Sequence, residues 1–388
     1  MQFSTSIQDN NLKQSWWKRF SSQPHQLFFT SAIFFAIFIM TLSLLSFLGK
    51  TDLNFALIHG FGLNYGLFTN AFLGFLITVM PKYNSSTIIK ENQYLNAWIV
   101  YQVGVLCSLF LSVFIGKILV SLVMFYFVKL FYSSIKEGKA FVKTDSIYIN
   151  LILCIGAALL AIEAITFYNL STLIFFAYLL SMVFIIALRM IPAFYFAHTR
   201  ITPWQRPEYV RPISFILLSV TGISMQFHFD IILKIVSFIS LIFFGFIIYK
   251  LNLFKKTPAL ISILVVGLLW FEIAYILLFL ESIFIPYSFK LSFHIFAIGF
   301  VTTLLIGFGS RVVMGHAVPP QAMVADKITV SLFFLTQIVL ISRVLVSVSF
   351  IANLDSFTIF LHLSSTLWIV LFVIWTIRYG KTLIHIKS

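Results

Sequence analysis

The side chains best suited to chemistry in this 388-residue chain are histidines that interrupt strongly apolar segments. His59, His294 and His362 each lie a few residues inside a different apolar run. An ionisable side chain costs about 2.5 kcal/mol or more at the centre of a membrane helix, so each histidine requires a partner or a function. Neutral imidazole is the commonest metal ligand, and histidines are common axial ligands of haem iron. The histidines therefore indicate a haem or metal site, with hydrogen bonding between helices as the alternative.

The composition identifies the surroundings of these histidines as a membrane. Hydrophobic residues make up 60% of the chain and charged residues only 10%. A soluble chain of this length could not bury so much apolar surface. The net charge of +14 is explained by Lys and Arg in cytoplasmic loops, so no nucleic-acid partner is expected. Cys107 and Cys154 form no CxxC pattern, which argues against a disulfide framework and a covalently attached haem.

The apolar runs predict an all-α polytopic membrane protein, a bundle of about twelve transmembrane helices. About 20 apolar residues are needed for each crossing. The expected spans are 27–48, 55–80, 95–116, 117–135, 146–166, 171–196, 211–229, 230–250, 259–281, 289–314, 327–349 and 356–377. The weakest boundaries fall at Gly116–Lys117 and around Asp230, so ten or eleven spans are the alternatives.

Loop charge gives an orientation for this bundle. Lys and Arg gather in the N-terminal tail, the even-numbered loops and the C-terminal tail, whereas the odd-numbered loops hold mostly Asp52, Asp230, Glu281, Asp355 and a few lysines. By the positive-inside rule both termini are cytoplasmic. We therefore expect a cytoplasmic tail at 1–26, one twelve-helix transmembrane domain at 27–377 and a second cytoplasmic tail at 378–388.

Three histidines share one depth in this arrangement. His59, His294 and His362 lie about four to six residues from the outer ends of their helices, or roughly 6–9 Å at a rise of ~1.5 Å per residue. His228, at the end of its span, is shallower. His316 follows His294 by 22 residues, about 33 Å along a helix, and therefore belongs to the opposite face of the membrane.

Two further groups of ionisable residues lie near or within the membrane. Those of the outer half are Glu163, Glu272, Lys234 and Arg343. Those of the inner side are His25, Arg189, His198, Arg311 and His316. Intramembrane charges mark binding sites or ion pathways, and cations of the outer group could pair with haem propionates. The inner group is either a second site or a set of residues that anchor helix ends at the interface.

A stripe of small residues runs along the second expected span. Gly62, Gly66, Asn70 and Gly74 recur every four residues, starting close to His59. Such a stripe allows two helices to approach closely. It is also consistent with a face opened for a flat ligand such as a haem, so both a helix-packing and a cofactor-facing role are open.

Four stretches, in this order, resemble the NnrS family of bacterial haem- and copper-containing membrane proteins. They are PHQLFF at 24–29, His59 with Gly66 and GFLITVMPKY at 74–83, LRMIPAF at 188–194, and His294 with Gly299 and RVVMGH at 311–316. The resemblance covers most of the chain, and the ordered set is more specific than any one stretch. Two departures from the family pattern occur. Phe61 and Gly62 stand where many members have a second histidine and an acidic residue. The small polar and basic residues that usually follow the Gly-His of the tenth span are replaced by Ala317, Val318 and Pro319.

The resemblance implies a multi-pass protein of the bacterial inner membrane that takes part in the response to nitric oxide and nitrosative stress, associated with denitrification. It implies haem and, given the missing histidine, less securely copper. Nitric oxide is the implied small-molecule ligand, and neither a redox partner nor a reaction is assigned. The expected cofactor-binding residues are His59, His294, His362 and Arg343, and the expected metal ligands are His59, His294 and His316.

The competing function is secondary transport. Glu163, Glu272, Lys234 and Arg343 would then couple ion movement to a substrate, and no iron would be bound. A reductase resembling the haem–copper oxidases is disfavoured, because too few of the eight histidines lie at a suitable depth.

Overall fold

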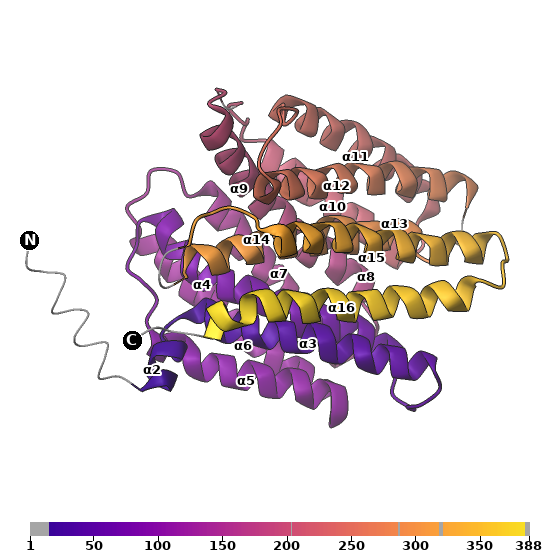
Figure 1. Cartoon of the computed structure of the whole chain (residues 1–388), viewed down its shortest axis with the longest axis horizontal. Coiled ribbons are helices and arrows are strands. Elements are labelled where there is room, and N and C mark those ends of the chain that lie inside the picture. Colours follow the sequence, from indigo (N-terminus) through magenta and orange to yellow (C-terminus); the bar gives the residue numbers. More distant parts are fainter. Residues whose placement is uncertain (1–14, 203, 286–287, 318–320, 385–388) are drawn as a thin grey trace, which may run out of the picture.

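The computed structural model describes residues 15–202, 204–285, 288–317 and 321–384, and every element within them is a helix. The long helices lie side by side in one bundle (Figure 1). In chain order the elements are α2 (Trp16–Ser21), α3 (Pro24–Phe47), η1 (Leu57–Thr69), α4 (Asn70–Asn84), α5 (Glu91–Phe110), α6 (Val113–Glu137), α7 (Thr144–Thr166), α8 (Ser171–Ile174), η2 (Phe175–Leu180), α9 (Ser181–Thr199), α10 (Val210–Gln226), α11 (Asp230–Leu251), α12 (Ala259–Phe284), α13 (Leu291–His294), η3 (Ile295–Thr302), α14 (Thr303–Gly315), α15 (Lys327–Ile351) and α16 (Phe357–Ile384).

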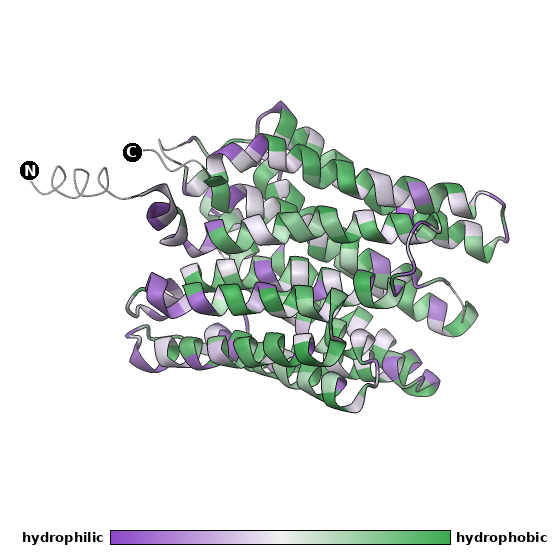
Figure 2. Ribbon diagram, turned by 90° about the horizontal axis from the view of Figure 1, so that it is seen from below, coloured by the Kyte–Doolittle hydropathy of each residue, from purple (hydrophilic) through white to green (hydrophobic). Residues whose placement is uncertain are grey.

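Ten continuous helices of the described chain are long and apolar enough to cross a membrane. Hydrophobic residues dominate the lengths of the helices, and hydrophilic residues gather toward their two ends (Figure 2). The two other expected spans coincide with α5 and with α10, which has 17 residues. The protein is therefore an all-helical, multi-pass membrane protein, and twelve crossings stay a prediction.

One predicted boundary is wrong. The turn expected at Gly116–Lys117 lies instead at 111–112, because Ser112 accepts a hydrogen bond from Ile115 N and caps α6. Gly116 is needed inside α6, since a Cβ there would come within 2.2 Å of Ser108 N in α5. Lys117 consequently lies within the span, where its side chain is buried.

Three helical segments form the centre of the bundle. They are η1–α4, α8–η2–α9 and α13–η3–α14, whose apolar stretches are 89%, 89% and 72% buried against 50% or less for the other seven. Phe175 of η2 packs on Phe293 of α13, with ring centroids 4.2 Å apart. Thr69 of η1 bonds Tyr178 of η2 through their hydroxyls at 2.9 Å. These three segments therefore form the most buried part of the bundle.

Each central segment contains a π-helix, a widened turn that is frequent at functional sites. At the end of each π-helix a hydroxyl donates to the carbonyl five residues earlier. The bonds run from Thr69 to Asn64, from Ser181 to Phe176 and from Thr302 to Ala297. In the α-helical parts, Ser and Thr hydroxyls typically reach back three or four residues, as Ser282 does to Phe279 and Thr41 does to Ile37.

The first and last described helices meet at one end of the bundle (Figure 1). Trp16 donates its indole N–H to Ile384 O at 3.2 Å, and Gln26 donates its amide to Leu383 O at 2.7 Å. We refer to this end as the inner end and to the opposite one as the outer end, following the predicted orientation. Because α3 runs from inner to outer, η1 begins at the outer end.

Candidate functional site

Two of the predicted histidines come together at the outer end. His59 near the start of η1 and His294 at the end of α13 have ring centroids 6.4 Å apart, with their planes at 37°. They lie 235 residues apart in sequence, so the fold rather than a local motif brings them together. Of the histidines expected at this depth, these two form a pair, which we call the outer histidine pair.

A tight turn places His294 at this position. Phe289 and Lys290 have left-handed backbones, with φ of 51° and 57°. The Glu281 carboxylate accepts a hydrogen bond from Ser292 N, with its two oxygens at 3.2 and 3.3 Å, and so caps the start of α13. Arg343 of α15 donates to Phe289 O at 3.0 Å. The turn is thus held from two neighbouring helices, α12 and α15.

Two neighbours lie at Nδ1 of His294 and require different tautomers, because a carbonyl oxygen only accepts a hydrogen bond and a guanidinium only donates one. This Nδ1 lies 2.8 Å from Lys290 O and 3.0 Å from Nη2 of Arg343. When Nδ1 carries the proton it donates to Lys290 O, and the lone pair is then on Nε2. Metal-bound histidines commonly have this arrangement, with the second ring nitrogen donating to a backbone carbonyl. Burial lowers the pKa of the neighbouring Lys290 ammonium below its usual value.

His59 has an unsatisfied ring nitrogen. Its Nδ1 is buried and has no hydrogen-bond partner within the described chain. Phe55 stacks on one face of the ring, with centroids 5.2 Å apart and planes at 18°. A Cβ added at Gly60 would meet nothing within 4 Å, so open space lies beside this histidine.

The other outer residues are distributed differently. His362 on α16 has a buried Nδ1 without a partner, and the contacts of the described chain do not join it to the outer histidine pair. His228 is exposed in the turn before α11, and Lys234 is exposed on that helix. Glu272 has one carboxylate oxygen that is buried and unpartnered in the described chain, and a Cβ at Gly245 would lie 2.9 Å from its other oxygen.

A second histidine pair lies at the inner end. The rings of His25, at the start of α3, and His316, just after α14, are 4.4 Å apart between centroids. His316 Nδ1 lies 2.9 Å from Val312 O, and the buried Nδ1 of His25 has no partner among the described residues. We call these two residues the inner histidine pair. In each pair one ring is oriented by a carbonyl four residues earlier and the other has an unpartnered Nδ1.

The remaining inner residues do not join this pair. Arg311 lies over the Phe194 ring at 4.0 Å. Arg189 lies over the Tyr83 ring at 3.8 Å and pairs with Asp145, and His198 is exposed. The predicted inner group is therefore divided among separate places. No set of three His, Cys, Asp or Glu side chains suited to one metal ion occurs in the described residues.

The glycine stripe faces α3. A Cβ at Gly62, Gly66 or Gly74 would come within 2.6 to 2.9 Å of side-chain carbons of that helix, contributed by Ile39, Phe35 and Phe28. Asn70 bonds Gly66 O at 2.7 Å, and its amide oxygen accepts from Gln102 of α5 at 2.7 Å. The stripe therefore packs helices together, and the outer histidine pair does not depend on it for space.

Comparison with known protein families identifies the family of this chain. The model of the NnrS protein family matches residues 19–387, nearly the whole chain. The chain belongs to the NnrS family. No curated protein sequence matches this NnrS chain.

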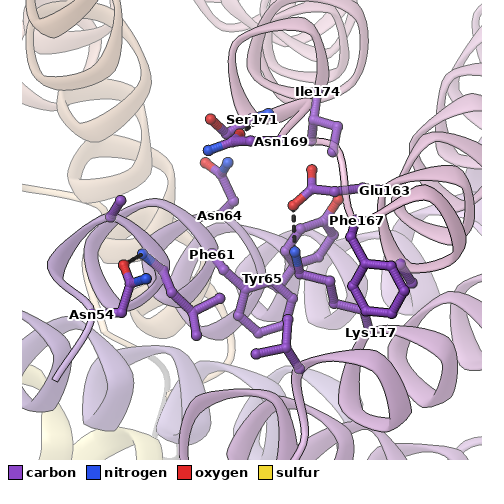
Figure 3. A pocket seen from close by; sticks show the side chains of 14 residues that line it. Asn54, Phe61, Asn64, Tyr65, Lys117, Glu163, Phe167, Asn169, Ser171 and Ile174 are labelled. Carbon is purple, nitrogen blue, oxygen red and sulfur yellow. Dashed lines mark hydrogen bonds and ion pairs between the residues drawn. The ribbon is translucent and has the colours of Figure 1, made fainter.

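This NnrS protein also has a polar cavity that the sequence did not predict. The cavity has a volume of about 210 Å³ and lies between η1, α6, α7 and α8. In Figure 3 the Lys117 ammonium and the Glu163 carboxylate face each other across it, and their ion pair is 2.5 Å long. Glu163 also accepts from Leu170 N at 3.1 Å. Glu163 thus has Lys117 as its ion-pair partner.

Two features of the sequence indicate the ion pairs of Lys117 and Asp145, which were not predicted. A lysine followed by a long apolar run, as in GKILVSLVMF at 116–125, is costly in a span unless it has an acidic partner. The boundary expected at Gly116–Lys117 places Lys117 in a turn, where it would need no acidic partner. Asp145 is an acidic residue in an otherwise basic inner loop, and such a residue is a candidate partner for the surrounding arginines.

Proposed function

We propose that this NnrS protein binds haem at the outer end of the bundle, with His59 and His294 as the axial ligands. The observation that carries the proposal is the ring separation of 6.4 Å. Two imidazoles on opposite sides of one metal ion, each bound at about 2.0 to 2.1 Å, place their ring centroids about 6 Å apart. A pair of histidines is also the donor set that a haem uses, since its macrocycle supplies the other four nitrogens.

The residues around the pair fit this role. The hydrogen bond to Lys290 O leaves Nε2 of His294 available, and the unpartnered Nδ1 of His59 marks a ring that lacks a partner. Arg343 places a permanent positive charge beside the ligand, where it can pair with a propionate. The open space beside Gly60 gives access for a flat group. Together these residues would hold, orient and neutralise the cofactor.

When bound, the haem would supply a redox-active iron, which would bind nitric oxide only where His59 or His294 gives up its place on the iron. The resemblance to NnrS proteins supports a role in the response to nitric oxide and nitrosative stress in the bacterial inner membrane. A small uncharged gas partitions into an apolar bundle and requires no polar channel. We assign binding and no catalytic reaction to this site.

The inner histidine pair is the second candidate metal position. His25 and His316 bring two imidazole rings within 4.4 Å of each other between centroids, and imidazole is a ligand suited to copper. Metal analysis per purified chain tests this position separately from the haem site. Copper that is lost in His316→Ala while iron is retained supports two separate sites.

The absorption spectrum of protein purified after expression with ample haem tests the haem proposal. A Soret band is expected in the wild type and in His362→Ala, because His362 lies outside the outer histidine pair. His294→Ala should lack the band. A wild-type protein without a Soret band, or a His294→Ala variant that retains it unchanged, overturns the proposal.

The transport hypothesis receives less support from the described contacts. Glu163 pairs with Lys117, Arg343 contacts His294, and Lys234 is exposed on α11. Glu272, the fourth group, has one buried oxygen without a partner in the described chain, so the contacts of the described residues do not join the four groups to one another. Substrate uptake that depends on a proton gradient, measured in proteoliposomes that contain no iron, would favour transport over haem binding.

A further inference from the structure

Four charged side chains converge at the inner end, where α7, α9 and α10 meet. Asp145 in the first turn of α7 accepts from Arg189 of α9 at 3.2 Å, from Arg206 of the following connection at 2.7 Å and from Arg211 in the first turn of α10 at 2.5 Å. We call this set the arginine cluster. Its residues come from three helices and one connection, so the cluster is a product of the fold.

The arginine cluster carries more positive charge than its own carboxylate neutralises. Three guanidinium groups and one carboxylate leave a net charge of +2, and the ion pairs of the described chain include no second acid here. Glu208, close to Arg206 in sequence, is exposed and outside these pairs. The side chains of Asp145, Arg206 and Arg211 are only 7%, 13% and 9% exposed. Buried charge without a counter-ion is strongly destabilising, so the excess calls for an anion.

The unused hydrogen-bond donors of the arginine cluster also indicate an anion. Each guanidinium has five N–H donors, and each of the three uses one on Asp145. Nη1 of Arg206 is buried and has no acceptor among the described residues. Burial also lowers the pKa of Arg206, and the positive charge of Arg211 adds to this effect. The cluster therefore has unused donors as well as unbalanced charge.

The position and openness of the cluster indicate the kind of anion. Asp145 and Arg211 are each the second residue of a helix, at the level where a span begins. Arg189 has 27% of its side chain exposed and lies flat on the Tyr83 ring, which leaves a route for entry. Planar guanidinium groups match the oxygen atoms of phosphate, and basic pockets between helices at the cytoplasmic side hold lipid phosphates.

We propose that the arginine cluster is a binding site for a phosphate-bearing anion at the inner membrane surface, with Arg189 and Arg206 as its main contacts. The site is independent of haem binding, because it lies at the opposite end of the bundle from the outer histidine pair. A lipid phosphate and free phosphate present the same oxygen atoms to these residues, so the experiment must separate the two sources.

Native mass spectrometry of the purified full chain in detergent provides that separation. One titration adds phosphatidylglycerol, a second adds neutral phosphatidylcholine, and a third adds inorganic phosphate against chloride at equal ionic strength. Tighter binding of phosphatidylglycerol than of the other two assigns a lipid headgroup, and equal binding of inorganic phosphate assigns a soluble anion. Binding no tighter than that of phosphatidylcholine and chloride overturns the proposal.

Variants tie the binding to the arginine cluster. Arg206→Gln and Arg189→Gln should each weaken the anion about 10-fold, as expected for one charge-assisted hydrogen bond of about 1.4 kcal/mol. Asp145→Asn should bind the anion more tightly, because the competing carboxylate is gone, whereas a purely structural cluster would only lose stability. Arg378→Gln, which removes an ion pair elsewhere on the inner side, is the matched control and should bind as the wild type does. Wild-type affinity in all three cluster variants contradicts the proposal.

Discussion

The two histidine pairs lie at opposite ends of the bundle and differ in spacing. His59 and His294 at the outer end are 6.4 Å apart between ring centroids, whereas His25 and His316 at the inner end are 4.4 Å apart. The wider spacing would leave room for one metal ion held by both rings. The closer rings are in contact, so an ion at the inner end would have to bind beside them.

The surroundings of the two pairs differ as well. His294 follows a turn that is held by the Glu281 carboxylate and the Arg343 guanidinium from two other helices. His316 is exposed just beyond the end of α14 and has one local hydrogen bond, to Val312 O. A preorganised ligand loses less freedom on binding, which favours the outer pair as the cofactor site. Two similar pairs of histidines can therefore differ greatly in how firmly neighbouring residues hold their rings in position.

The largest expected effect separates the two pairs directly. His59→Ala should remove the Soret band and the bound iron completely, because a single remaining imidazole no longer spans the site. His25→Ala should retain both, since it changes the other end of the bundle. Iron per chain and visible absorbance are the measurements, and a His25→Ala protein without haem would reverse the assignment of the two pairs.

A smaller effect is expected from the guanidinium that fixes the outer turn. Arg343→Ala should lower the free energy of unfolding by about 2–3 kcal/mol, because buried hydrogen bonds to Phe289 O and Ser347 Oγ are lost. Thermal unfolding in detergent measures this loss. If Arg343 positions His294, the position of the Soret band should shift as well, and Arg343→Lys should restore part of that shift.

A change of stability with an unchanged spectrum would limit Arg343 to a structural role. Arg378→Ala is the matched control, since it removes an arginine whose carboxylate partner is 44% exposed. Exposed ion pairs contribute only about 0–1 kcal/mol, so the control should remain near the wild type.

The sequence predicted the helices and one of the pairs for physical reasons that can be traced. Apolar runs of about 20 residues are strong signals, and each expected span coincides with a helix. Equal depth, together with their places in the two helices that best match the family, suggested His59 and His294 as neighbours. Depth alone could not exclude His362, because the rotation of a helix about its own axis is not encoded in a nearly uniform apolar run.

The position of Lys117, the π-helices and the pairing of His25 with His316 were not predicted, because none of them follows from apolar runs or from depth in a span. Lys117 was placed in a turn because Gly116 was interpreted as a helix break, when it permits the close approach of α5 and α6. The π-helices follow from interactions in the bundle centre and have no periodic signal of their own. The pairing of His25 with His316 requires the end of α14 to meet the start of α3, which no spacing in the sequence reveals.

A more modest effect is expected at the cap that orients the outer turn. Glu281→Ala leaves Ser292 N without its acceptor and should cost about 1 kcal/mol of stability, as other helix caps do. Glu281→Gln keeps a carbonyl oxygen at the same place and should remain close to the wild type. Unfolding midpoints of the two variants decide this, and an equal loss in both would show that the negative charge, rather than the hydrogen bond, matters.

The smallest effect concerns the inner end and depends on pH. Burial raises the pKa of the Asp326 carboxyl, but hydrogen bonds from Thr329 and Arg378 outweigh it and lower the pKa below its usual range. A carboxyl with a lowered folded-state pKa contributes stability above its unfolded value of about 3.9, and this is lost as the pH falls through the folded-state value. Asp326→Asn should therefore reduce stability slightly at pH 7, and this loss should shrink as the pH falls toward the lowered pKa of the wild-type carboxyl. The unfolding midpoints of the two proteins should converge as the pH falls from pH 7 to pH 3. A difference that stays constant would show that the shape of the Asp326 side chain, which caps the start of α15, matters rather than its charge.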